Sequence, residues 1–207
     1  MRWFGYGCFL FSDDNNRVVF DPHDGKSLGI FPPNADADIV ICSHNTFARN
    51  SFRNIRGNHT DFNTVRGRQC TRGFEFEGFP STSIYDDGEN SIYRFVMDGI
   101  TVVVCGCLGD IPGTDVLRAI SGADIMVVPI GEYSTMPMGT VNRLIGITAP
   151  RIVVPSEFKA GGITIPLSNI QAFSEGRDPE EFAYVGNEVE FDVDDIQDYS
   201  GVWIFDF

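Results

Sequence analysis

Short apolar runs separated by turn signals dominate the sequence and predict a strand-rich fold. Residues 2–11 and 17–21 flank a cluster of Asp and Asn residues, which is typical of a β-hairpin. Residues 38–42 form a continuous apolar run, as expected for a strand that is covered on both faces. The next stretch, 44–72, has little periodicity and is rich in Asn, Arg and Gly. We therefore expect it to be loop with a short helix.

The second half of the chain alternates predicted strands with short predicted helices. Residues 74–78 and 91–97 alternate as half-buried strands do, and Asp98-Gly99 supplies a hairpin turn into residues 101–105. The remaining patterns predict buried strands at 124–130 and 151–155, helices at 115–120, 140–146 and 167–173, and acidic strands at 183–192 and 202–207. Strand-rich halves with helices outside them indicate stacked sheets in a mixed α/β fold.

Composition and charge narrow the class of protein. The chain has 207 residues, 43% of them hydrophobic, which is enough for one well-buried core and short for two ordinary domains. We expect a single domain, 1–207. The formal net charge of −14 argues against a nucleic-acid or anionic-membrane surface, because most of the molecule would repel phosphates. No segment approaches the roughly 20 apolar residues that cross a bilayer. The expectation is an acidic cytoplasmic protein.

The five cysteines form an odd set without the spacing of a disulfide framework, so reduced thiols are expected. Cys105 and Cys107 could bind a soft metal or act as a redox pair. Strand alternation would place both thiols on one face among apolar neighbours, and this favours inert packing.

Candidate chemistry begins with His44, which follows the apolar run at 38–42 within the segment Ser43-His44-Asn45-Thr46-Phe47-Ala48-Arg49. This strand and loop resemble the metal loop of the metallo-β-lactamase superfamily. Further short motifs follow in the same order across roughly residues 1–160 and are most similar to the ascorbate-6-phosphate-lactonase-like branch. They are Gly5-Tyr6-Gly7-Cys8-Phe9, Val19-Phe20-Asp21-Pro22, Asn90-Ser91-Ile92-Tyr93, Val104-Cys105-Gly106-Cys107-Leu108-Gly109, Pro129-Ile130-Gly131 and Val154-Pro155-Ser156-Glu157-Phe158. The resemblance implies a four-layer αββα sandwich with its site at one edge of the two sheets.

The same resemblance assigns the metal-ligand positions, and most of them carry other residues here. The seven positions fall on His44, Thr46, Ala48, Arg49, Tyr85, Cys107 and Glu157. Only His44 is a family ligand. A catalytic zinc ion needs about three protein ligands and an open position for water, so ordinary dinuclear hydrolysis is not expected. The resemblance leaves one weak alternative, a single zinc or manganese ion held by His44, Cys107 and Glu157.

Arg49 and Glu157 replace ligands of the same metal and carry opposite charges. We predict that they form a bidentate ion pair that takes over the electrostatic role of the metal. The alternative is that Arg49 points to solvent.

Arginines concentrate in the loop that leaves this site, at Arg49, Arg53, Arg56, Arg66, Arg68 and Arg72. Arginine suits bidentate recognition of phosphate or carboxylate, so Arg49, Arg53 and Arg56 are candidates for binding an anionic small molecule. Alternatively, these arginines pair with the acidic residues at 178–198, in the same chain or across a homo-oligomer.

The sequence therefore predicts a metallo-β-lactamase-like fold with a degenerate metal site, which needs no cofactor and binds an anionic small molecule or a protein partner. Two alternatives stay open. One is a hydrolase of lactone or phosphoester substrates with the residual single-metal site. The other is a structural subunit that self-associates through its acidic C-terminal strands.

Overall fold

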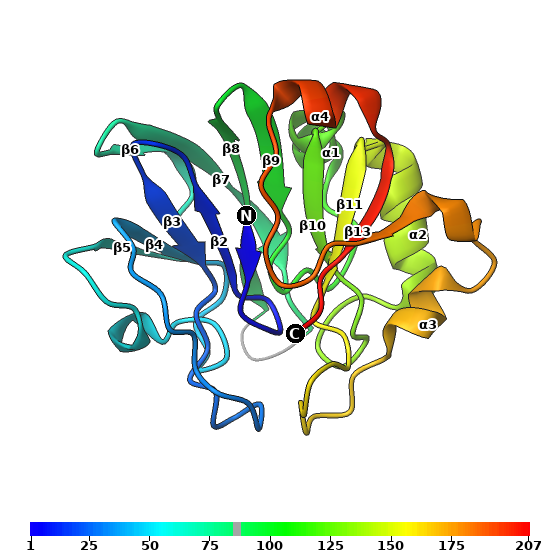
Figure 1. Ribbon diagram of the computed structural model, residues 1–207, viewed down its shortest axis with the longest axis horizontal. Coiled ribbons are helices and arrows are strands. Elements are labelled where there is room, and N and C mark those ends of the chain that lie inside the picture. The colour runs from blue at the N-terminus through cyan, green and yellow to red at the C-terminus, as the bar shows by residue number, and fades with distance from the viewer. Residues whose placement is uncertain (85–87) are drawn as a thin grey trace.

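The computed structural model describes residues 1–84 and 88–207, and in this part of the chain the strands form two sheets (Figure 1). The smaller sheet has the order β1-β2-β3-β4-β5. Its strands are β1 (Arg2–Trp3), β2 (Phe9–Ser12), β3 (Arg17–Phe20), β4 (Ile39–Cys42) and β5 (Thr60–Asn63). The predicted hairpin is confirmed, because β2 and β3 pair antiparallel across the Asp-Asn turn. The 2–11 strand is interrupted, however, at Gly5-Tyr6-Gly7, where the chain turns between β1 and β2.

The larger sheet has the order β12-β13-β11-β10-β9-β8-β7-β6. Its strands are β6 (Gly67–Thr71), β7 (Phe74–Thr82), β8 (Glu89–Met97), β9 (Ile100–Val104), β10 (Ile125–Pro129), β11 (Ile152–Ser156), β12 (Phe182–Tyr184) and β13 (Gly201–Ile204). The hairpins from β6 to β9 are antiparallel, whereas β9, β10, β11 and β13 run parallel. Strands β10 and β11 are buried along their whole length, as their apolar runs predict.

The helices are α1 (Thr114–Ile120), α2 (Met138–Thr148), α3 (Ile170–Ser174) and α4 (Val193–Asp198), with 3-10 helices η1 (Phe52–Asn54) and η2 (Pro179–Glu181). In Figure 1, α2 and α3 lie on the side of the larger sheet away from the smaller one, and α1 contacts α2. Apolar side chains from η1 and residues 35–37 pack on the other side of the smaller sheet, against Val19 and Val40. The mixed α/β fold with two packed sheets is thus confirmed. None of the helices within 1–84 and 88–207 is long and apolar enough to span a bilayer.

The main hydrophobic core lies between the two sheets. Phe9, Phe11 and Phe20 of the smaller sheet belong to the same buried cluster as Tyr93 and Phe95 of the larger one. Phe20 stacks on Phe95 with ring centroids 5.3 Å apart. Because these side chains alternate along their strands, each sheet buries one face against the other.

Three predicted elements need correction. The 44–72 stretch contains β5 and β6 as well as η1, so it is not simply loop. Within 183–192 only the start is strand, since β12 ends at Tyr184, and helix α4 follows at Val193. The helix predicted at 167–173 begins later, at Ile170.

Candidate functional site

Arg49 is directed into the protein by the tight turns that follow β4. The Thr46 amide donates to the His44 carbonyl at 3.0 Å, and the Arg49 amide donates to the Thr46 carbonyl at 2.8 Å. These turns bury Arg49, whose residue surface is only 2% exposed. An arginine is rarely buried so deeply without a partner.

Glu157 supplies that partner from the end of β11. Arg49 Nη2 lies 2.5 Å from Glu157 Oε1, with both side chains buried. The predicted pair is therefore present, but it is not bidentate. Within the described residues, neither Glu157 Oε2 nor Arg49 Nε has a hydrogen-bond partner. Burial raises the pKa of the Glu157 carboxyl, and the Arg49 charge opposes this effect.

Tyr6, in the turn between β1 and β2, contacts the Arg49 guanidinium with both its ring and its hydroxyl. Its ring centroid lies 4.9 Å from Arg49 Cζ, and its hydroxyl accepts a hydrogen bond from Arg49 Nη2 at 3.2 Å. The Tyr6 carbonyl accepts from the Glu157 amide at 3.0 Å. Tyr6 and Glu157 both adopt left-handed backbone conformations, with φ of 57° and 58°. Such conformations are costly for non-glycine residues and cluster at functional sites.

Asp21 is a second buried carboxylate near the ion pair. It accepts hydrogen bonds from the Ser43 amide at 2.6 Å and from the Ser43 hydroxyl at 2.7 Å. Burial raises the pKa of Asp21 to about 6, against the opposing effects of Arg49 and of the Ser43 hydrogen bonds. The sequence did not predict a role for Asp21 or for Tyr6. The sequence feature that could have indicated both residues is their position at turns that end or interrupt apolar strands.

Cys107 lies in the loop after β9, so the prediction that both thiols lie on one strand face is wrong. Its amide donates to Asn90 Oδ1 at 2.9 Å, and its sulfur lies 3.4 Å from Ser83 Oγ. Burial raises the pKa of the Cys107 thiol and raises that of Cys105 to about 12. All five cysteines are free, as expected.

A pocket of about 190 Å³ opens beside the ion pair. Its lining includes five of the seven predicted ligand positions, His44, Thr46, Ala48, Arg49 and Cys107, together with Tyr6 and Ser134. His44 Nδ1 contacts the Glu89 carbonyl oxygen. Thr46 Oγ1 is buried and has no hydrogen-bond partner among the described residues. The sixth position, Glu157, contacts Arg49, and the seventh, Tyr85, lies outside the described residues.

Among the described residues, the assigned positions do not form a group of metal donors. In residues 1–84 and 88–207, no three His, Cys, Asp or Glu side chains come together as a group that could hold a metal ion. Two of the positions bring no suitable atom, because Ala48 has no donor and Arg49 carries a fixed positive charge. The proposed grouping of His44, Cys107 and Glu157 is therefore not formed.

The other candidate arginines do not line this pocket. Arg53 lies exposed on η1, and Arg56 pairs with Asp36 at 2.8 Å. Arg66 and Arg68 pair with Glu89 and Glu77 of neighbouring strands. In the described part of the chain, Arg56, Arg66 and Arg68 thus pair with acidic residues between 36 and 89, and not with those at 178–198 of the same chain.

Residues 1–157 match the family model of the β-lactamase superfamily domain. The chain belongs to the β-lactamase superfamily. The predicted resemblance is confirmed at this level, and the match ends at Glu157, the last of the assigned ligand positions. No curated protein sequence matches the chain.

Solved structures of this superfamily fold resemble the chain over most of its length. A Thermotoga maritima protein assigned as a Zn-dependent hydrolase of the metallo-β-lactamase superfamily is 24% identical, with a TM-score of 0.82 and coverage of 99% of this chain and 97% of the other. An isothiocyanate hydrolase from Delia radicum gut bacteria is 11% identical, with a TM-score of 0.63 and coverage of 83% and 88%. A metallo hydrolase from the archaeon Ignicoccus hospitalis is 16% identical, with a TM-score of 0.57 and coverage of 84% and 88%. At these identities the likeness establishes the fold alone.

Proposed function

We propose that this protein is a non-hydrolytic member of the β-lactamase superfamily that binds a small anionic molecule beside a buried ion pair. The observation that carries the proposal is the 2.5 Å contact between Arg49 and Glu157, at two positions that the resemblance assigns to metal ligands. A guanidinium in this place repels a cation, and its partner carboxylate is already engaged. In this proposal the site retains the loops that carry metal ligands in a hydrolase, and the Arg49 guanidinium supplies the positive charge at the place of the metal.

Two polar groups in the pocket favour a ligand with oxygen acceptors. Thr46 Oγ1 and Arg49 Nε are buried without hydrogen-bond partners among the described residues, and both residues line the pocket. A buried donor without a partner costs about 1–3 kcal/mol, which a carboxylate, phosphate or lactone oxygen would recover. The resemblance to the ascorbate-6-phosphate-lactonase-like branch supports an oxygen-rich compound of sugar type. The pocket volume of about 190 Å³ restricts the part of the ligand held there to a few polar groups.

Metal analysis tests the non-hydrolytic assignment. The purified protein is incubated with excess zinc or manganese, passed through gel filtration and analysed for metal content. We expect almost no bound metal and no change in thermal unfolding on addition of chelator. About one tightly bound ion per chain, lost with chelator, would overturn the proposal and favour the single-metal hydrolase. Hydrolysis of phosphorylated lactones and phosphoesters would then become the relevant assay.

Ligand binding is tested separately with inorganic phosphate and with sugar phosphates, by calorimetry. Thr46→Val removes the hydroxyl and keeps the shape of the side chain, so we expect binding to weaken about tenfold, the effect of one or two lost hydrogen bonds. Ser12→Ala, at an exposed serine of the β2–β3 hairpin, is the matched control and should bind as the wild type does. Equal binding by wild type and Thr46→Val would show that this pocket is not the anion site.

A further inference from the structure

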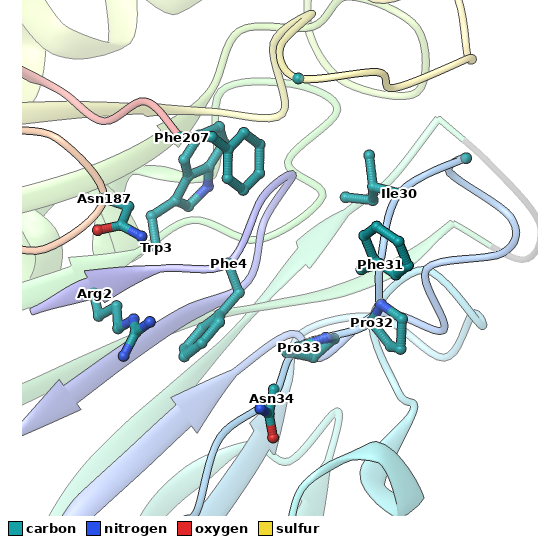
Figure 2. A pocket seen from close by; sticks show the side chains of 12 residues that line it. Arg2, Trp3, Phe4, Ile30, Phe31, Pro32, Pro33, Asn34, Asn187 and Phe207 are labelled. Carbon is teal, nitrogen blue, oxygen red and sulfur yellow. The ribbon is translucent and has the colours of Figure 1, made fainter.

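A second pocket, of about 610 Å³, is lined by residues 29–34, whereas the pocket beside Arg49, here called the site pocket, is lined by Ser27 and Leu28. It is bounded by the end of β1, the segment 29–34 and Phe207 (Figure 2). None of its lining residues lines the site pocket. Its volume falls within the range of about 300–1,000 Å³ that is usual for small-molecule sites.

We propose that this pocket binds a flat aromatic molecule carrying one carboxylate. The proposal does not depend on the function assigned to Arg49 and Glu157. It follows from the aromatic walls of the pocket, from the close contacts that fix those walls, and from the cationic group at one end.

Aromatic rings form the walls. Phe31 is 92% and Phe207 is 63% exposed, and Phe207 stacks on the buried Trp3 with ring centroids 4.8 Å apart. In Figure 2, Phe31 and Pro32 lie across the pocket from Trp3 and Phe207, and Phe4 lies below Trp3, near Arg2. Exposed rings that face a common cavity gain from a planar apolar ligand, because it removes several aromatic faces from water at once.

The wall formed by Phe207 fits against two glycines. A β-carbon at Gly161 would lie 2.3 Å from Phe207 Cδ2, and one at Gly5 would lie 2.9 Å from both Phe207 Cζ and Ile30 Cδ1. Both glycines have positive φ. The backbone at Gly5 and Gly161 therefore lies closer to Phe207 and Ile30 than a residue with a β-carbon would allow. These contacts fix the position of the Phe207 ring before any ligand binds.

Arg2 supplies the charge at the end of the pocket away from Phe31 and Pro32 (Figure 2). Its side chain is 42% exposed, and its Cζ lies 5.1 Å from the centroid of the Phe4 ring. Its contact with Glu188 is 3.9 Å long, beyond hydrogen-bond distance, so the guanidinium keeps donors for a ligand. The exposed Asn187 lies at the same end and adds an amide donor. This set of donors matches a carboxylate.

Calorimetry with 2-naphthoate and with neutral 2-naphthamide tests the proposal. We expect one molecule of 2-naphthoate to bind per chain, about tenfold more tightly than the amide, since a charged acceptor gains more from a guanidinium. Phe31→Ala should weaken both compounds, because it removes one wall. Arg2→Gln should weaken only 2-naphthoate, to the level of the amide.

Two controls locate the binding. Arg118→Gln changes an exposed, ion-paired arginine on α1 and should leave both affinities unchanged. Thr46→Val changes only the site pocket and should also leave both affinities unchanged. Loss of 2-naphthoate binding can therefore be told apart from loss of anion binding beside Arg49. Absence of 2-naphthoate binding, or binding that Phe31→Ala does not weaken, would overturn the site. Equal loss of both compounds in Arg2→Gln would overturn the assignment of a carboxylate ligand. Circular dichroism establishes that each variant is folded.

Discussion

Arg49 and Glu157 show how a buried ion pair constrains a protein more than it stabilises it. Taking two charges out of water is expensive, and their attraction, with one additional hydrogen bond that Arg49 donates to the Tyr6 hydroxyl, roughly offsets that cost. Removing only one partner leaves an uncompensated charge in the interior. The pair therefore couples the loop after β4 to the loop after β11, although it adds little net stability.

We expect Arg49→Met and Glu157→Leu each to lower the free energy of unfolding by about 3–5 kcal/mol, because each leaves one buried charge without its partner. The double variant should be more stable than either single variant. Urea denaturation measures all four proteins of this cycle. Arg66→Met breaks the exposed pair with Glu89 and should cost at most about 1 kcal/mol. Additive losses in the double variant would contradict the coupling.

Asp21 should make stability depend on pH in the opposite direction from an ordinary paired carboxylate. Its pKa is raised from 3.8 to about 6, so between these values the folded state binds more protons than the unfolded state. The contribution of Asp21 to stability is then present at low pH and is lost as the pH rises from about 4 to about 6.

Asp21→Asn removes this titration and retains an acceptor for the Ser43 amide. Between pH 4 and pH 7, the unfolding free energy of the wild type should fall by about 2–3 kcal/mol relative to Asp21→Asn. Asp38→Asn is the control of opposite sign, because the hydrogen bond from Arg17 lowers the pKa of Asp38. A constant difference between wild type and Asp21→Asn would mean that Asp21 does not titrate in this range.

The sequence located the site better than it described the contacts within it. The order of the motifs placed Arg49 and Glu157 together, because both positions follow strands whose ends meet at one edge of the sandwich. The contact of Tyr6 with Arg49 was not predictable, since it depends on a left-handed turn that interrupts an apolar run. Arg56 lies away from the pocket in a pair with Asp36, and Arg53 lies exposed on η1; sequence spacing encodes neither placement.

Among the elements, burial decides which were predictable. β4, β10 and β11 are buried throughout and appear as continuous apolar runs. β5 and β6 have half-exposed polar residues and are held by backbone pairing to β4 and β7, so no hydrophobic pattern marks them. Helix α4 was also missed, although its capping box was readable from the sequence as Asp192 and Asp195.

The cap of α4 provides a test for that element. The Asp192 side chain accepts hydrogen bonds from the amides of Asp194 and Asp195 at 2.9 Å and 3.0 Å. Asp192→Ala should lower the free energy of unfolding by about 1 kcal/mol, whereas Asp192→Ser should cost little, because serine caps helices nearly as well. Thermal denaturation of both variants measures the difference. Equal losses would indicate that the carboxylate acts through its charge and not as a cap.

The described part of the chain forms two sheets around one main core. Since apolar packing holds the sandwich and the Arg49–Glu157 pair adds little net stability, the fold should tolerate restoration of the ligands that the superfamily resemblance assigns. Thr46→His, Ala48→Asp, Arg49→His and Glu157→His, combined in one variant, remove the internal charge pair and add four metal-binding side chains beside His44.

This combined variant should be less stable than the wild type without metal and should regain stability when zinc is added. A ligand that binds only the folded state stabilises it by about 2.7 kcal/mol at a concentration of 100 times its dissociation constant. Thermal unfolding with and without zinc measures the gain, and elemental analysis measures the bound metal. The wild type should show neither change. A folded variant that takes up no zinc would mean that the assigned positions do not converge on one metal, and the ion pair could then not be regarded as its replacement.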